Sequence, residues 1–188
     1  MVEIEAKIRV GDLNAVRKRL TECGAEFIGD YTESNHILDR QGKSLRSAGC
    51  GLRVRTVETN RGQSAPATFT FKGPVEKSTV KRREEIEVEF LDAEKMLRIL
   101  AAIGFDTLLS YTKRRESWSL EGCRIELDEV PLLGTFVEIE GPTEQAIDFV
   151  RNRLELSDQA HVAQGYVGML ANRCRELGRS MIEIDFVD

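Results

Sequence analysis

Pairs of carboxylates recur in this sequence at a spacing that places both on one face of a β-strand. Glu-Ile-Glu occurs at residues 3–5, 85–87 and 138–140, each time where polar and apolar residues alternate. Because successive strand side chains point to opposite faces, both acids of each copy share a face and the isoleucine lies on the other. Neighbouring carboxylates repel unless water, cationic side chains or a divalent metal compensates their charge. The three pairs therefore predict charged strand faces with compensating partners.

Lysine and arginine residues follow the same alternation. Lys7 continues the face of Glu3 and Glu5, and further bases of this kind are Arg53, Arg55, Lys72, Arg83, Lys113 and Arg115. If these faces converge, the bases can surround a polyphosphate, since guanidinium groups bind phosphate oxygens two at a time. Carboxylates beside them would repel that substrate unless they hold Mg2+ or Mn2+, which bridge carboxylates to phosphates. The combination of acidic and basic side chains on these faces predicts metal-assisted phosphoryl or nucleotidyl transfer.

Three helices are predicted where a capping residue precedes apolar residues at helical spacing, beginning after Asp12, Asp92 and Thr143. Each follows a Glu-Ile-Glu strand, so a strand–helix unit repeats along the chain. A fourth helix is expected at 162–177, and an edge strand within 180–188.

About eight strands complete the predicted fold. The breaker-rich stretches 58–66 and 73–79 are typical of hairpin connections. Strands joined in this way, with amphipathic helices, predict an α+β fold dominated by antiparallel sheet whose apolar face the helices cover. The charged face either meets solvent in an open sheet or lines a tunnel in a closed barrel. Alternation alone does not decide between the two, although it favours the solvated face, because charged strand faces usually meet solvent.

Composition limits the class of protein. A chain of 188 residues favours a single domain spanning residues 1–188. The net charge of −5 argues against nucleic-acid binding. No apolar run approaches the ~20 residues of a membrane span, and the N-terminus is a charged strand instead of a signal peptide. The four cysteines form no CxxC pair, which favours reduced thiols in the cytoplasm.

The ordered set of charged motifs resembles the CYTH domain family, the triphosphate tunnel metalloenzymes. Glu3-x-Glu5-x-Lys7 matches the family's ExExK signature. The later elements follow in the family's order as Arg53-x-Arg55, Lys72 in Phe-Lys-Gly-Pro, Arg83-x-Glu85-x-Glu87, Lys113-x-Arg115, Leu-Asp128-x-Val-Pro-x-x-Gly134 and Glu138-x-Glu140. The resemblance spans residues 2–141 and extends to the segment around Tyr166. It implies a closed eight-stranded antiparallel β-barrel, forming a tunnel, with amphipathic helices packed outside.

The resemblance also implies roles for individual residues. The metal-binding acids, for Mg2+ or Mn2+, are Glu3, Glu5, Glu138 and Glu140, with Asp128 beside them. Glu85 and Glu87 either hold a second metal or orient the bases through ion pairs. The triphosphate-binding bases are Lys7, Arg53, Arg55, Lys72, Arg83, Lys113 and Arg115, of which Lys7 and Arg115 are also the catalytic candidates.

In a closed barrel the opposite strand faces should lie under the helices. The residues expected there are Ile4, Val54, Phe71, Ile86, Ile125 and Ile139. Four further charged residues are expected at a solvated rim, namely Arg9, Glu89, Arg124 and Glu126. One departure from the family concerns residues 35–38: relatives often have Asp-x-Tyr-Phe where this chain has Asn-His-Ile-Leu.

Two reactions are implied by the family, whose CyaB-like branch this chain resembles most. Class IV adenylyl cyclases convert ATP to cyclic AMP and pyrophosphate, whereas tripolyphosphatases and thiamine triphosphatases use water as the nucleophile. The expected partner is thus ATP, tripolyphosphate or thiamine triphosphate, with no nucleic acid or membrane, and a homodimer is left open. A non-catalytic binder of anionic phosphate metabolites is the alternative, and retention of every acid argues against it.

Overall fold

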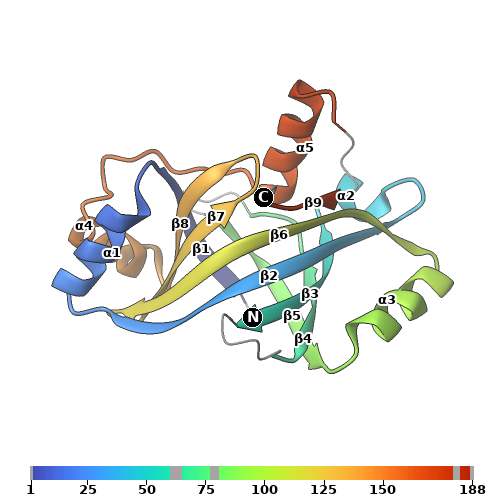
Figure 1. Ribbon diagram of the computed structural model, residues 1–188, viewed down its shortest axis with the longest axis horizontal. Helices are drawn as coiled ribbons and strands as arrows, with labels where there is room; N and C mark the ends of the chain where they lie inside the picture. Colours follow the sequence, from blue (N-terminus) through green and yellow to red (C-terminus); the bar gives the residue numbers. More distant parts are fainter. Residues whose placement is uncertain (1, 60–64, 77–80, 180–182, 187–188) are drawn as a thin grey trace.

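Eight antiparallel strands form a closed barrel (Figure 1). The computed structural model describes residues 2–59, 65–76, 81–179 and 183–186. The barrel strands are β1 (Val2–Val10), β2 (Glu26–Arg40), β3 (Gly51–Thr59), β4 (Ala67–Lys72), β5 (Lys81–Phe90), β6 (Phe105–Leu120), β7 (Cys123–Val130) and β8 (Gly134–Glu140). Their order is β2-β3-β4-β5-β1-β8-β7-β6, and β6 pairs with β2 to close the sheet. The predicted closed barrel is confirmed.

The two longest strands, β2 and β6, pair along most of their length and set the register of the charged residues. Glu33 lies opposite Lys113, and the ladder has irregularities between Phe27 and Gly29 and between Ile37 and Leu38. Such bulges bend a strand and increase its twist, which helps a sheet to close. The charged faces of neighbouring strands therefore meet on the inside.

Three helices pack on the outside of the barrel, and each begins where a cap was predicted. These are α1 (Leu13–Glu22), α3 (Ala93–Ala102) and α4 (Glu144–Arg153). Asp12 and Asp92 accept backbone N–H bonds of 2.8 and 2.9 Å in the first turns of α1 and α3. Thr143 accepts one of 3.1 Å at the start of α4. Each cap typically stabilises its helix by about 1 kcal/mol.

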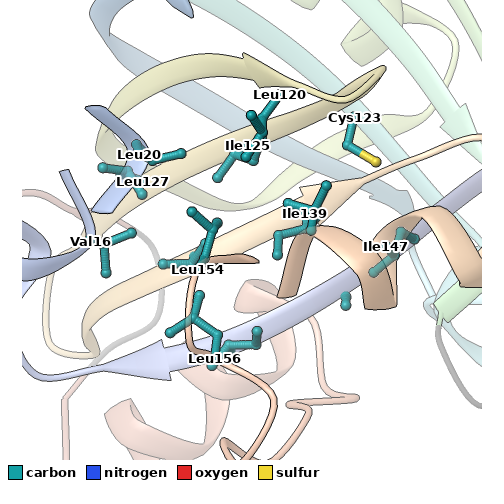
Figure 2. Packing of buried hydrophobic residues seen from close by; sticks show 14 residues of the cluster. Val16, Leu20, Leu120, Cys123, Ile125, Leu127, Ile139, Ile147, Leu154 and Leu156 are labelled. Atoms are coloured by element: carbon teal, nitrogen blue, oxygen red, sulfur yellow. The ribbon is translucent and has the colours of Figure 1, made fainter. Parts of the chain in front are cut away.

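The largest apolar core lies between α1, α4 and strands β1, β6, β7 and β8. Leu20, Ile125, Ile139 and Ile147 are buried there, and Figure 2 shows how they converge. Each fully buried side chain of this size contributes about 1.5–3 kcal/mol relative to an exposed one. This packing holds β1 and β8, which carry two of the three acid pairs.

A second core lies beneath α3, where Val54 is buried and Phe71 is partly buried. Ile4 is likewise partly buried, against the first core. The expectation for Ile86 was wrong, because its side chain is 57% exposed. The reason is that α3 leaves the end of β5 and packs against β3 and β6 instead, so it does not cover the outer face of β5 at that point.

The fourth predicted helix, α5 (Tyr166–Glu176), begins four residues later than expected and lies apart from α1, α3 and α4 (Figure 1). Its core contacts include Leu109, Tyr111 and Phe136, which share strand faces with the charged residues. Helix α5 therefore covers one end of the barrel, whereas all helices were expected on the outside. The chain just before it pairs with β1, where the Val162 N–H donates to the Lys7 carbonyl at 2.7 Å.

Two short elements complete the described structure. Helix α2 (Ser44–Ser47), which was not predicted, precedes β3, and β9 (Glu183–Ile184) pairs parallel with β6. The expected edge strand is thus present in part, while residues 180–182 and 187–188 lie outside the described residues. The two hairpin connections join β3 to β4 and β4 to β5, as predicted, with residues 60–64 and 77–80 also outside that range. In the described part of the chain, no helix combines the length and apolarity that a membrane crossing requires.

Candidate active site

The interior of the barrel contains a cavity of about 950 Å³. All but one of the predicted site residues line it. Those in the lining are Glu3, Glu5, Lys7, Arg53, Arg55, Lys72, Arg83, Glu85, Glu87, Lys113, Arg115, Glu138 and Glu140. Asp128 is the exception. The alternating strands therefore bring together charged side chains that are up to 137 positions apart in the sequence, from Glu3 to Glu140.

Arg115 is held tightly by two acids from neighbouring strands. Its Nε and Nη2 each donate to a different oxygen of Asp128 at 2.6 Å, and Nη2 also donates to Glu138 at 2.5 Å. Burial would lower the pKa of Arg115, but Asp128 and Glu33 outweigh it and raise that pKa well above its ordinary value. A planar guanidinium fixed by a two-point contact has a defined orientation toward a ligand.

Asp128 lies behind the bases and has no exposed surface. Besides Arg115, its carboxylate accepts hydrogen bonds from Lys113 Nζ at 3.1 Å and from the Tyr166 hydroxyl at 2.8 Å. Burial and the negative charges of Asp128 and Glu138 raise the pKa of Tyr166 well above its usual range, so the hydroxyl stays protonated. With four donors engaged, Asp128 is placed to position the bases. These contacts suit a positioning role, while the metal-binding role of Asp128 stays a prediction.

Lys7 lies in the same part of the cavity and is 2% exposed. Its Nζ is 3.1 Å from Glu138, 4.0 Å from Glu5 and 4.1 Å from the centre of the Tyr166 ring. Burial alone would lower the pKa of Lys7, but Glu138 and Glu5 more than compensate and leave it raised. Lys7 is therefore a cation at neutral pH, supported by two acids and an aromatic face.

A second group of bases comes from β4 and β5. Lys72 Nζ lies 2.6 Å from Glu85 and 3.3 Å from Glu3, and Arg83 Nε is also 3.3 Å from Glu3. Burial and the nearby charge of Arg53 lower the pKa of Lys72 to about 8 despite Glu3. Lys72 is thus a cation that a bound anion would stabilise further.

Glu85 and Glu87 face bases in this group. Arg53 Nη2 is 3.7 Å from Glu87 and 4.0 Å from Glu85, and Thr70 donates to Glu87 at 2.5 Å. Of the two roles left open for these acids, this pairing supports orientation of the bases.

Glu140 differs from the other acids of the cavity. Among the side chains that the structure describes, it has no ion-pair partner within 4.0 Å. Burial and the nearby carboxylates of Glu3, Glu5 and Glu85 raise its pKa. Within the same residues, no three carboxylate, histidine or cysteine side chains already converge as metal ligands, since several acids point to bases. A hard divalent cation fits this donor set, because it prefers carboxylate oxygens and would relieve their repulsion.

Sequence reasoning missed Glu33 of β2 and noted Asn35 only as a departure from the family, and both residues are buried. Glu33 lies 2.9 Å from Arg55 and 3.3 Å from Lys113, and Asn35 accepts a 2.9 Å bond from Arg55 Nε. Polar residues such as Thr32 occupy the opposite face of β2 as well, so the alternation that marks the inner face of other strands is weak here. Asn35 stands where relatives often have aspartate, and its side-chain oxygen still accepts a hydrogen bond from Arg55 but carries no negative charge.

Glu126 also lies where the sequence did not place it. It was expected at a solvated rim, but it is 4% exposed, and the Ser117 hydroxyl donates to it at 2.5 Å. Its strand partner across the ladder is Glu138, which faces the cavity. Burial therefore raises the pKa of Glu126 even though Arg115 opposes the shift. The charged lining of the cavity on β7 therefore includes Glu126, which the sequence placed at the rim.

Comparison with known proteins agrees with the family resemblance of the sequence. The sequence profile described as CYTH domain matches residues 1–166. The protein MJ0240 of Methanocaldococcus jannaschii is 32% identical over 140 residues, which are 74% of this chain and 77% of that protein. Adenylate cyclase CyaB of Aeromonas hydrophila is 26% identical over 159 residues, covering 84% and 78% of the two chains. The solved structure of the PH1819 protein from Pyrococcus horikoshii OT3 has a TM-score of 0.79 at 27% identity, covering 91% of this chain and 99% of that one.

Proposed function

The chain belongs to the CYTH domain family, and we propose that it is a metal-dependent enzyme that acts on a triphosphate bound inside its barrel. One observation carries the proposal: a single cavity joins bases from five strands, β1, β3, β4, β5 and β6, with the paired acids of β1 and β8. A linear triphosphate presents negative charges along its length, which suits cations projecting from several walls. The cavity volume of about 950 Å³ is in the range of small-molecule sites.

The bases bind and orient the phosphates. Arg53, Arg55, Lys72 and Arg83 extend from the strands on one side of the barrel, where guanidinium and ammonium groups can each donate to phosphate oxygens. Arg115 is already fixed by its acidic partners, so little reorganisation is needed when charge develops on the phosphate. This arrangement accounts for both predicted groups, the substrate-binding bases and the catalytic candidates.

Four acids would hold the metal, Mg2+ or Mn2+, namely Glu3, Glu5, Glu138 and Glu140. When bound, such a cation neutralises charge on the phosphate oxygens and favours departure of the leaving group. The raised pKa of Glu140 supports this assignment, since it reflects acids crowded together in a buried place. Glu3 and Glu138 also pair with bases and would exchange those contacts for the metal, whereas Glu85 and Glu87 keep theirs and are assigned to orientation.

The nature of the nucleophile decides which reaction takes place. In a cyclase the 3′-hydroxyl of ATP attacks the α-phosphorus and expels pyrophosphate, whereas in a hydrolase water attacks the γ-phosphorus. The relative CyaB is named an adenylate cyclase, which supports ATP as a substrate to test alongside tripolyphosphate and thiamine triphosphate. The proposal covers both reactions, because both begin with the same bound triphosphate.

The test is incubation with each triphosphate and Mg2+ or Mn2+, with cyclic AMP, pyrophosphate and orthophosphate resolved as products. We expect turnover of at least one substrate, loss of activity with EDTA and recovery when metal is restored. Glu140→Gln should abolish turnover, whereas Glu129→Gln, which changes an acid whose side chain is 45% exposed, should not. Full activity in EDTA would contradict the metal-dependent mechanism. Binding of all three triphosphates without any turnover would instead indicate a binding protein.

A further inference from the structure

Glu33 is a buried carboxylate in the wall of the barrel for which the mechanism above has no use. It lies on β2, which pairs with β3 on one side and β6 on the other, and it is 1% exposed. Three bases from those two strands face it. Arg55 Nη1 is 2.9 Å away, Lys113 Nζ is 3.3 Å away and Arg115 Nη1 is 3.8 Å away. Glu33 thus joins bases that belong to different strands.

These bases keep Glu33 ionised. Burial alone would raise the pKa of Glu33, but Arg55, Lys113 and Arg115 outweigh it and hold that pKa well below its ordinary value. Glu33 is not among the residues that line the cavity, unlike the acids assigned to the metal. Its charge therefore acts on its neighbours in the wall and not directly on a ligand.

The contacts of Arg55 show what Glu33 achieves. Asn35, two residues further along β2, accepts from Arg55 Nε at 2.9 Å, while Glu33 faces Nη1. Two sides of the guanidinium are thereby held from β2. Lys113 is held in a comparable way, between Glu33 and Asp128. Without these acceptors, long side chains of like charge would repel each other and sample several rotamers.

We propose that Glu33 is a positioning residue that orients Arg55 and Lys113 for phosphate binding and turnover. The proposal rests on the proposed function, since it assumes that these bases contact a triphosphate. A substrate that must itself order the bases reacts more slowly, because part of the binding free energy is used for that ordering. Removing the carboxylate also adds one net positive charge near the cavity. This charge attracts the anionic substrate and offsets the binding free energy that ordering the bases uses. Positioning therefore predicts a lower kcat without weaker binding of the triphosphate.

The first test is Glu33→Gln, which keeps the shape and removes the charge. With the triphosphate that the wild type turns over, kcat should fall about 10- to 100-fold, the scale of a small misplacement of catalytic groups. The Kd for tripolyphosphate, measured by titration calorimetry, should be unchanged or lower. Glu116→Gln makes the same chemical change on the outer face of β6, where Glu116 pairs with Arg17. This control should keep kcat within about twofold of the wild type.

A second variant, Glu33→Asp, keeps the charge but is one methylene shorter, so it cannot reach both bases. We expect a kcat between those of the wild type and Glu33→Gln. If Glu33→Gln does not fold, as judged by circular dichroism, this variant decides the question. Wild-type kcat in every folded Glu33 variant would overturn the proposal, and so would a weaker Kd at unchanged kcat.

A readout independent of turnover separates this proposal from the proposed function. The Nε–H signal of Arg55 in ¹⁵N-labelled protein, assigned by its loss in Arg55→Lys, should exchange slowly with solvent in the wild type and in Glu116→Gln. In Glu33→Gln it should exchange faster or disappear. A wild type that turns over no triphosphate would contradict the proposed function alone. An unchanged Arg55 signal in Glu33→Gln would contradict positioning by Glu33, whatever the activity.

Discussion

Replacing Asp128 with asparagine tests whether this acid positions bases or binds metal. The amide has nearly the same shape, but it is uncharged and presents an NH2 group to side chains that are themselves donors. Asp128 has no exposed surface, and it accepts from Lys113, from two nitrogens of Arg115 and from Tyr166 at 2.6–3.1 Å. At least one of these contacts must become donor against donor in the variant.

The size of the effect follows from burial. Removing one partner of a buried ion pair leaves an uncompensated charge, which typically costs about 3–5 kcal/mol. Arg115 keeps Glu138 at 2.5 Å, which argues for the lower part of that range. For a domain of this size each 1 kcal/mol lowers Tm by about 2–4 °C, so Asp128→Asn should melt about 6–15 °C below the wild type.

Two measurements distinguish the roles. The free energy of unfolding comes from urea titration, with Asp106→Asn, a change at an exposed aspartate, as the control expected within about 0.5 kcal/mol of the wild type. The affinity for Mn2+ comes from calorimetry on the folded proteins and should change little in Asp128→Asn. Near-normal stability combined with lost Mn2+ binding would refute the positioning role and restore Asp128 as a metal ligand.

Three other changes give measurable effects. Asn35→Asp places a second carboxylate against Arg55, so tripolyphosphate should bind more weakly by about 1–2 kcal/mol; an unchanged Kd in calorimetry would count against phosphate binding near this residue. Tyr166→Phe removes one donor to Asp128 and should cost about 1–3 kcal/mol of unfolding free energy in urea, so a neutral result would mean that this bond contributes nothing. Because the folded pKa of Glu33 lies below its ordinary value of 4.5, its stabilising effect is present above that pH and is lost as pH falls toward the folded pKa. The gap in Tm between the wild type and Glu33→Gln should therefore narrow from about pH 6 to about pH 3, and a constant gap would show that ionised Glu33 does not stabilise the fold.

The strands with strict alternation were predictable because their two faces differ in polarity. In β1 the charged residues Glu3, Glu5 and Lys7 alternate with buried or partly buried apolar ones, and all three line the cavity as expected. Helix starts at Asp12 and Asp92 were predictable for a local reason, since capping involves only the first turn. Closure of the barrel was implied by the family resemblance, because alternation does not determine whether an open sheet closes.

The remaining features depend on contacts distant in the sequence. Glu33 lies on a strand that is polar on both faces, and its role emerges only when β3 and β6 lie beside it. Ile86 was expected to be covered because it is apolar, but the path of α3 is set by packing against other strands. Helix α5 covers the end of the barrel because its apolar residues, such as Leu170, pack against Leu109 and Phe136, and because the Tyr166 hydroxyl donates to the buried Asp128.

Titration calorimetry of tripolyphosphate, with sulfate as a competing anion, tests most directly whether the cavity binds triphosphates. Arg53→Ala removes a base whose side chain is 13% exposed in the cavity wall, and Arg98→Ala removes an exposed base of α3 as the control. We predict that the wild type binds tripolyphosphate in the presence of excess sulfate. Arg53→Ala should weaken this binding by about 1.5–3 kcal/mol, the value of a charge-assisted hydrogen bond, while Arg98→Ala should not. Equal affinity in all three proteins, or complete displacement by sulfate, would contradict the triphosphate site.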